Sequence, residues 1–211
     1  MSTMFETQET AIIASAAVAA ERRRSIRTYA ARLIDEADLR EMLRLAGRAP
    51  SAFNAQPWRF VVVRDEVLKE KLSEAAYNQQ QVVRAPATIV IYSDMEDAIE
   101  RMPEAMHPDM PAEKREAGVA GFRATFAKKT IEERAAWGAE QSNIALGYLL
   151  LLAESFGFAT SPMLGFEPEK VKALLGLPAH VRIPAIVSIG YAGEEGARPH
   201  RLDGDSLVDF R

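Results

Sequence analysis

One stretch of the chain, IALGYLLLLA at residues 144–153, is apolar on every face of a helix. It lies near the end of a segment, residues 131–158, that begins with the mixed apolar and charged pattern of an amphipathic helix. A helix without a polar face is buried on all sides. The stretch is also too short to cross a bilayer, which takes about 20 apolar residues. The sequence therefore predicts a long helix that the rest of a soluble fold must cover.

The N-terminal apolar stretch, AIIASAAVAA at residues 11–20, belongs to a second predicted helix over residues 8–23. Arginines follow this stretch, whereas a signal peptide carries its positive charge before the apolar run. We therefore expect both apolar stretches to be helical parts of a cytoplasmic protein that does not enter the membrane.

The remaining pattern mixes helices and strands without a regular βαβ repeat. The spacing predicts helices over residues 36–47, 65–78, 121–129 and 166–176, and strands over residues 59–65, 88–93 and 183–191. Residues 102–111 contain three prolines and indicate a loop, and the C-terminal tail is expected to be extended. This order favours an α+β fold. No G-x-G-x-x-G stands between a strand and a helix, which argues against a dinucleotide-binding unit.

Composition limits the classes of function. The 211 residues suit one domain, residues 1–211, able to bury roughly 70% of its unfolded surface. A net charge of −4 gives no reason to expect binding to nucleic acid or to an anionic membrane. The absence of cysteine excludes disulfides, thiolate metal ligands and cysteine nucleophiles.

The sequence also contains no motif typical of a metal site or of catalysis by side chains. His107, His180 and His200 do not have the spacing of metal ligands, and no G-x-S-x-G motif is present. No pair of carboxylates is singled out. We therefore expect no metal site.

A basic cluster follows the first predicted helix, and it consists of Arg22, Arg23, Arg24 and Arg27 around Ser25. One interpretation is a solvated charge run that suits the dipole at a helix C-terminus. The other is an anion site, because guanidinium groups pair with phosphate oxygens and a serine hydroxyl adds a donor. Arg198 and Arg201 form a second cluster near the C-terminus, which could converge on the same phosphate.

Two further motifs are open to two interpretations each. The loop APSAFNAQPWRF at residues 49–60 leads into the strand-like VVV, and a polar, rigid loop of this kind is typical of ligand contact. TSPMLGFE at residues 160–167 is either an ordinary turn or a place where Gly165 lets the backbone approach a flat ligand.

Four segments in this order resemble the nitroreductase family of flavin enzymes. They are RRSIRTY at residues 23–29, APSAFNAQPWRFVVV at 49–63, AAYNQQQVVRAPATIVIY at 75–92, and PMLGF at 162–166 with the late arginines. The resemblance implies an α+β sandwich with a central, mostly antiparallel sheet flanked by helices. It also implies an intertwined homodimer, in which the N-terminal helix and the C-terminal tail wrap the partner, with FMN bound at the subunit interface.

The resemblance implies a role for each matching residue. The FMN phosphate, ribityl chain and pyrimidine edge would meet Arg23, Arg24, Ser25 and Arg27, and the phosphate would also meet Arg201 and Arg198. The opposite subunit would supply Pro50, Ser51, Ala52 and Asn54. The ring would be lined by Asn78, Met163, Leu164 and Gly165, with a backbone N–H near N5. Arg27 would stabilise the negative charge of reduced flavin.

Some positions depart from the family pattern. Gln81 stands where some members have a lysine, Leu164 where some have an acidic residue, and Pro199 where some have a basic one. These differences bear on the redox potential and the substrate preference. Phe122 or Phe126 either covers the flavin as a mobile lid or packs on a helix face.

The resemblance implies an oxidoreductase that takes electrons from NADH or NADPH and reduces a small electron-poor acceptor such as a nitroaromatic or a quinone. The alternatives are another flavin reaction, such as enoate or aldehyde reduction or dehalogenation, or an FMN-binding protein without turnover. A third alternative is a helical dimerisation module whose arginines are solvated.

Overall fold

The computed structural model describes residues 15–211. Its centre is a sheet of four strands in the order β1-β2-β4-β3, and every neighbouring pair is antiparallel. The strands are β1 (Trp58–Val63), β2 (Ala87–Ser93), β3 (Ala159–Met163) and β4 (Arg182–Gly190). The two central strands, β2 and β4, are buried along nearly their whole length. Helices must therefore cover both faces of the sheet.

Side-chain alternation along the central strands sends residues to opposite faces. Ile89 and Val187, which are register partners, lie in a first apolar cluster, whereas their neighbours Val90 and Ile186 lie in a second. Both strands read as nearly continuous apolar runs in the sequence because both of their faces are buried.

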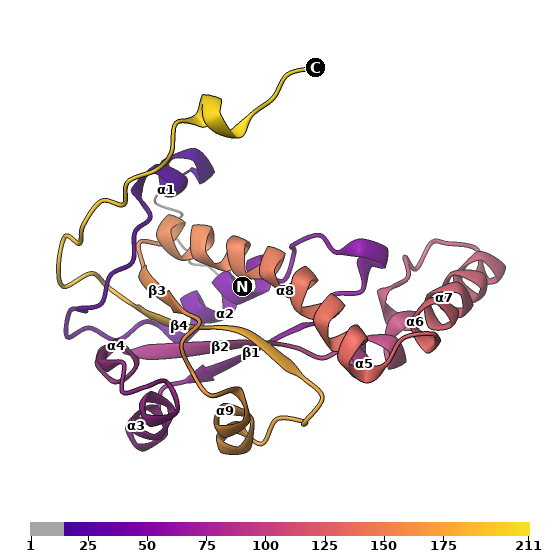
Figure 1. Cartoon of the computed structure of the whole chain (residues 1–211), viewed down its shortest axis with the longest axis horizontal. Helices are drawn as coiled ribbons and strands as arrows, with labels where there is room; N and C mark the ends of the chain where they lie inside the picture. Colours follow the sequence, from indigo (N-terminus) through magenta and orange to yellow (C-terminus); the bar gives the residue numbers. More distant parts are fainter. Residues whose placement is uncertain (1–14) are drawn as a thin grey trace, which may run out of the picture.

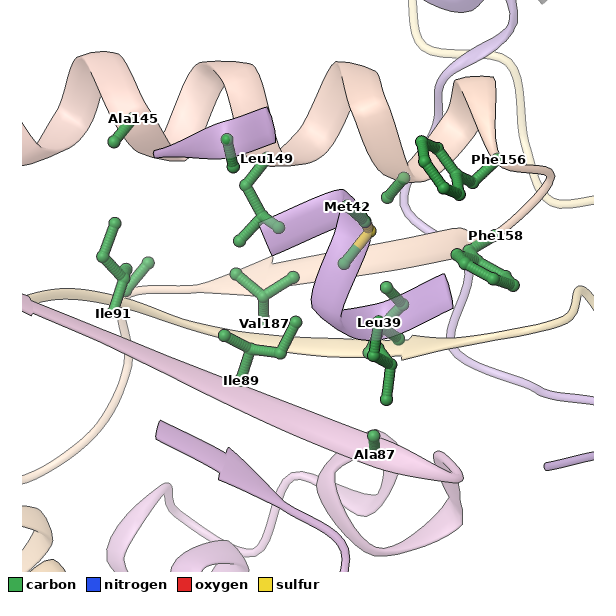
Figure 2. Close-up of a cluster of buried hydrophobic side chains, with 14 of the residues drawn as sticks. Leu39, Met42, Ala87, Ile89, Ile91, Ala145, Leu149, Phe156, Phe158 and Val187 are labelled. Atoms are coloured by element: carbon green, nitrogen blue, oxygen red, sulfur yellow. The ribbon is translucent and has the colours of Figure 1, made fainter. Parts of the chain in front are cut away.

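Two helices cover the first face, α2 (Glu36–Ala46) and α8 (Ile131–Ser155). Figure 2 shows Leu149 of α8 and Met42 of α2 directed at Ile89 and Val187 of the sheet. Thr130 caps α8 in a capping box, since its hydroxyl accepts the Glu133 N–H while the Glu133 carboxylate accepts the Thr130 N–H. The long helix thus has a defined start and one fully buried face.

Three helices cover the opposite face, namely α3 (Glu66–Ala75), α4 (Gln80–Arg84) and α9 (Pro168–Leu175). Figure 1 shows α8 on one side of the sheet and α3 and α9 on the other, so the molecule has three layers. The second cluster joins Leu72 of α3, Val171 of α9 and Met163 of β3 to the sheet.

A further helical group extends from the end of the sheet at which β2 finishes. It consists of α5 (Met95–Glu100), α6 (Met102–Ala105) and α7 (Ala112–Ala127). The short helix η1 (Ala52–Asn54), in the loop before β1, lies beside this group. A third cluster holds this group together through Met95, Met102, Phe122 and Phe126. The two remaining helices are α1 (Ala16–Arg22) and η2 (Gly204–Leu207).

The two edges of the sheet differ. Ser25 pairs with Thr160, so the chain after α1 runs along the outer edge of β3. No strand in residues 15–211 pairs with the outer edge of β1. A groove of about 560 Å³ lies along that edge. Its lining combines apolar side chains such as Leu39, Phe60 and Leu68 with the charged residues Glu36, Arg40, Arg64 and Asp65.

The structure confirms the α+β class and the antiparallel sheet flanked by helices. It also corrects three expectations. Strand β3 was not predicted, α6 occupies part of a predicted loop, and α7 starts at Ala112 and not at residue 121. Of the helix predicted over residues 8–23, the part up to residue 14 lies outside the described residues.

The expectation that α8 is buried on all sides is wrong for the single chain. Ile144 and Tyr148 are 40% and 41% exposed, although Ala145 and Leu149 on the neighbouring face are fully buried. The sheet covers one side of the apolar stretch and leaves the other side open. Nowhere in residues 15–211 does a helix have both the length and the apolar character needed to cross a membrane.

The contact between α8 and α5 gives a test of the packing. A Cβ added at Gly138 would collide with Ser93 Oγ and Met95 Cγ, whereas one added at the exposed Gly121 of α7 would meet nothing within 4 Å. We expect Gly138→Ala to lower the free energy of unfolding by about 1–3 kcal/mol. Gly121→Ala should leave it unchanged or raise it by up to about 1 kcal/mol through helix propensity. Urea denaturation measures both, and equal effects of the two variants would contradict the packing.

Candidate functional site

The segment that follows α1 is fixed to the edge of β3 by its backbone. The Ile26 N–H donates to the Thr160 carbonyl at 3.0 Å. The Glu194 carboxylate accepts the N–H groups of Arg27 and Thr28 at 2.9 and 3.1 Å. These two backbone hydrogen bonds, with smaller contributions from the Thr28 side chain and the Arg27 charge, lower the pKa of the Glu194 carboxyl below its ordinary value. The segment is thus held from both sides, which gives the side chains of the basic cluster a fixed origin.

Arg23 is the most unusual member of this cluster. Its Nη1 is buried and has no hydrogen-bond partner among the described residues. Burial lowers the pKa of the Arg23 guanidinium, the positive charge of Arg201 lowers it further, and the Glu154 carboxylate partly opposes both effects. A buried N–H group without a partner is costly. Two arginines that repel each other beside such a group fit an anion between them.

The C-terminal tail brings the second arginine cluster to the first. Arg198 lies 3.5 Å from the Glu21 carboxylate of α1, and Arg201 lies close enough to Arg23 to shift its pKa. In Figure 1 the tail passes α1 on its way to the C-terminus. The tail arginines therefore lie near α1 and Arg23 within one chain, and their convergence on one phosphate stays a prediction.

The turn after β3 carries the predicted ring-lining residues. Leu164 is 78% exposed, and Gly165 is exposed beside it. The Met163 side chain instead points into the second cluster, where its sulfur lies 3.2 Å from Gln81 Nε2. Only the main chain of Met163 can therefore face a ligand on the open side of the turn.

A second loop lies against this turn and contains Asn78. Gln79 Nε2 donates to the Gly165 carbonyl at 2.8 Å, which joins the two segments. Tyr77 and Asn78 have positive φ angles of 55° and 58°, a conformation that non-glycine residues seldom adopt. The Asn78 N–H holds this conformation by donating to the Ser73 carbonyl at 2.8 Å.

The segment after α1, the outer edge of β3, the turn at Leu164 and Gly165, and the loop with Asn78 form one continuous strip, called here the β3 strip. Ser25 marks one end at Thr160, and Gly165 marks the other. Five residues of extended chain span about 16 Å. The strip can therefore take an elongated ligand with an anionic head near Arg23 and a flat part near Gly165.

The loop at residues 50–56 lies at the other end of the sheet, before β1 and beside α5, α6 and α7. Figure 1 shows this distance from α1 and the β3 edge. Pro50, Ser51, Ala52 and Asn54 are therefore not brought to the strip by their own chain. The resemblance implied that they act on the opposite subunit, and their position in the single chain agrees with that.

The backbone of this loop is nevertheless strained, and hydrogen bonds hold it in place. Phe53, Asn54 and Gln56 have positive φ angles of 59°, 54° and 45°. The Ala52 N–H donates to Gln141 Oε1 at 2.9 Å, and Asn54 Nδ2 donates to the Ala105 carbonyl at 2.8 Å. Each strained residue costs on the order of 1–3 kcal/mol, and such strain gathers at functional sites.

The aromatic residues near this loop differ from the expectation of a lid. Phe122 and Phe126 are both 1% exposed and pack in the third cluster, so the structure favours the packed interpretation. Phe53 is the exposed ring, at 58%, and it contacts Phe122 edge-on at 5.5 Å between ring centroids. The exposed position of Phe53 was not predicted, because no local sequence pattern reveals its positive φ angle.

Comparison with known proteins decides the family. The family model described as "Nitroreductase family" matches residues 20–191, which include the β3 strip and the loop at residues 50–56. The chain belongs to the nitroreductase family.

Individual relatives and solved structures are consistent with this membership of the nitroreductase family. A Thermus thermophilus protein named NADH dehydrogenase is 49% identical over 94% of this chain and 97% of its own length. A solved structure from Exiguobacterium sibiricum, in complex with FMN, is 27% identical with a TM-score of 0.85 and covers 94% of this chain and 98% of that one. An enone reductase of gut-bacterial fatty acid saturation is 25% identical with a TM-score of 0.82, covering 94% and 99% of the two chains.

Proposed function

We propose that the protein is an FMN-dependent NAD(P)H oxidoreductase that reduces nitroaromatics, quinones or similar electron-poor acceptors. The observation that carries this proposal is the Arg23 guanidinium, whose buried Nη1 has no partner in the described chain and which lies near Arg201. A phosphomonoester carries about −1.5 to −2 charges and offers several acceptor oxygens. It satisfies both the unpaired N–H and the repulsion between the two guanidinium groups.

Different residues of the β3 strip contact different parts of the cofactor. In our proposal the phosphate meets Arg23, Arg24, Ser25, Arg198 and Arg201. The ring lies against Asn78, Met163, Leu164 and Gly165, with Met163 contributing its main chain, and a second copy of the chain adds Pro50, Ser51, Ala52 and Asn54. Arg27 offsets the negative charge at the pyrimidine edge.

The chemistry follows from that division. When bound, FMN supplies hydride transfer between a nicotinamide and an acceptor that use the same face in turn. The chain itself binds, orients and excludes water, and in our proposal it contributes no catalytic side chain. A shared site of this kind needs no separate dinucleotide-binding unit.

A homodimer completes the proposal. The helix α8 exposes Ile144 and Tyr148 on one face. An exposed apolar face on a helix that otherwise packs in the core suits contact with a second copy of the chain. The tail exposes Leu207, Val208 and Phe210, apolar side chains that suit a C-terminal arm packed on a second copy. Both features favour an intertwined dimer, and only a second copy could add the loop at residues 50–56 to the strip.

The dimer can be tested on α8. We expect Ile144→Asp to halve the mass of the protein in solution and to release FMN, because the site needs loops from both chains. Val67→Asp is the matched control, since Val67 is also an exposed apolar helix residue, at 58%, but lies on α3 across the sheet. Sedimentation equilibrium and flavin absorbance measure the two effects. A dimeric, yellow Ile144→Asp variant would argue against this interface.

The proposed activity is tested by colour. The purified protein should be yellow, and anaerobic NADH or NADPH should bleach it within seconds to minutes. Added quinone or nitroaromatic should then restore the absorbance. A colourless protein that does not take up FMN would refute the proposal, and a yellow protein that never bleaches would indicate a binding protein without turnover.

The phosphate contact is tested by neighbouring arginines. Arg23→Ala should raise the Kd for FMN by about 10- to 100-fold, the usual value of a charged hydrogen bond. Arg22→Ala removes an exposed arginine of the last turn of α1 and should change the Kd little. Fluorescence titration of FMN into the apoprotein gives both constants. Equal constants for the two variants would mean that the phosphate lies elsewhere.

One relative favours a second candidate. The enone reductase shares the fold over nearly the whole of both chains. An activated alkene accepts a hydride as a quinone does, so the same site could reduce it. Including an α,β-unsaturated ketone among the acceptors of the bleaching experiment distinguishes the two functions.

A further inference from the structure

Three consecutive glutamines, Gln79, Gln80 and Gln81, lie at the junction of the Asn78 loop and α4. Their side chains have different partners. Gln79 Nε2 donates to the Gly165 carbonyl at 2.8 Å, and Gln81 Nε2 donates to Gln79 Oε1 at 3.1 Å. Gln80 is exposed and reaches only the Asn78 carbonyl, at 3.2 Å. Two of the three glutamines thus form a relay that ends on Gly165.

The relay fixes the orientation of the Gln79 amide. Its oxygen accepts from Gln81, so its nitrogen must face Gly165. Gln81 is itself anchored, because its side chain is 9% exposed and lies against the Met163 sulfur at 3.2 Å. The Gly165 carbonyl is therefore held toward Gln79.

This contact decides what the turn offers to a ligand. Gln79 donates to the Gly165 carbonyl and fixes its direction, whereas the Gly165 N–H has no acceptor within residues 15–211. At Gly165 the turn therefore has a free hydrogen-bond donor, while the Gly165 carbonyl is held toward Gln79. Leu164 adds no charge there, and it is 78% exposed.

We propose that Gln79 is a positioning residue that keeps the reduction potential of bound FMN low by holding the Gly165 carbonyl toward itself. The inference rests on the proposed function, in which the flavin N5 lies at this turn. Oxidised flavin accepts a hydrogen bond at N5, whereas the form that has gained two electrons and a proton there donates one. A Gly165 N–H that is free to donate to N5, beside a carbonyl that Gln79 holds in another direction, favours the oxidised form.

Removing the relay reverses this preference. Without the Gln79 side chain, the Gly165 carbonyl is free to accept the N5–H of the reduced form. One hydrogen bond gained in one redox state changes the ratio of the two FMN affinities by about tenfold. For a two-electron couple a tenfold ratio corresponds to about 30 mV, and the direction is a more positive potential.

The test compares FMN-loaded wild type, Gln79→Ala and Gln80→Ala by anaerobic potentiometric titration followed by flavin absorbance. Gln79→Ala should have a potential about 30 mV more positive, and Gln80→Ala should match the wild type. A Gln79→Ala potential that is equal to or lower than that of the wild type overturns the inference. An equal rise in Gln80→Ala overturns it as well.

A second variant keeps the result decisive. Gln81→Leu leaves Gln79 in place but frees its amide to rotate, so it should raise the potential by a smaller amount. If Gln79→Ala fails to fold or to retain FMN, Gln81→Leu decides alone, and an unchanged potential then overturns the inference. Wild type that binds no FMN refutes the proposed function itself, which separates the two failures.

Discussion

The rest of the structure depends on the two-sided apolar surface of α8. One side of the helix packs through Ala145 and Leu149 on the central strands β2 and β4. The neighbouring face presents Ile144 and Tyr148, which stay 40% and 41% exposed. Apolar burial contributes about 25 cal/mol per Å², so an uncovered face of a core helix favours association. In the proposed dimer, the packing that completes the core also completes the site, because the loop at residues 50–56 reaches the β3 strip only from a second copy.

The electrostatics of the strip follow from where its backbone is fixed. Glu194 holds the Arg27 and Thr28 N–H groups, and Thr160 holds Ile26, so Arg23 is directed into a partly buried position. Burial lowers its pKa, and Arg201 from the other end of the chain adds to that effect. A protein gains no stability from two such cations alone. The arrangement makes sense as a site whose counter-charge arrives with a ligand, which is why the solvated interpretation of the cluster fits Arg22 better than Arg23.

Sequence reasoning succeeded where one physical pattern dominates. Helical spacing located α2, and continuous apolar runs located β2 and β4. It failed at β3 because ATSPM is short and contains Pro162 in its interior, which cannot donate a ladder hydrogen bond and is found mainly on edge strands. The arginine clusters were found, but the burial that separates Arg23 from its neighbours depends on tertiary contacts. The positive φ of Phe53 and the hydrogen bond from Gln79 to Gly165 have no local signature at all.

The distribution of backbone strain connects the two separate parts of the proposed site. In the part of the chain that the structure describes, the non-glycine residues with positive φ are Phe53, Asn54, Gln56, Tyr77 and Asn78. They occupy two loops at opposite ends of the sheet, and neither loop contains a glycine that would relieve the strain. Strain at this cost persists only when the surrounding contacts over-determine it, as the bonds from Ala52 to Gln141 and from Asn78 to Ser73 do here. Two strained loops that lie far apart within one chain fit the proposed site, in which each of two chains supplies one of them.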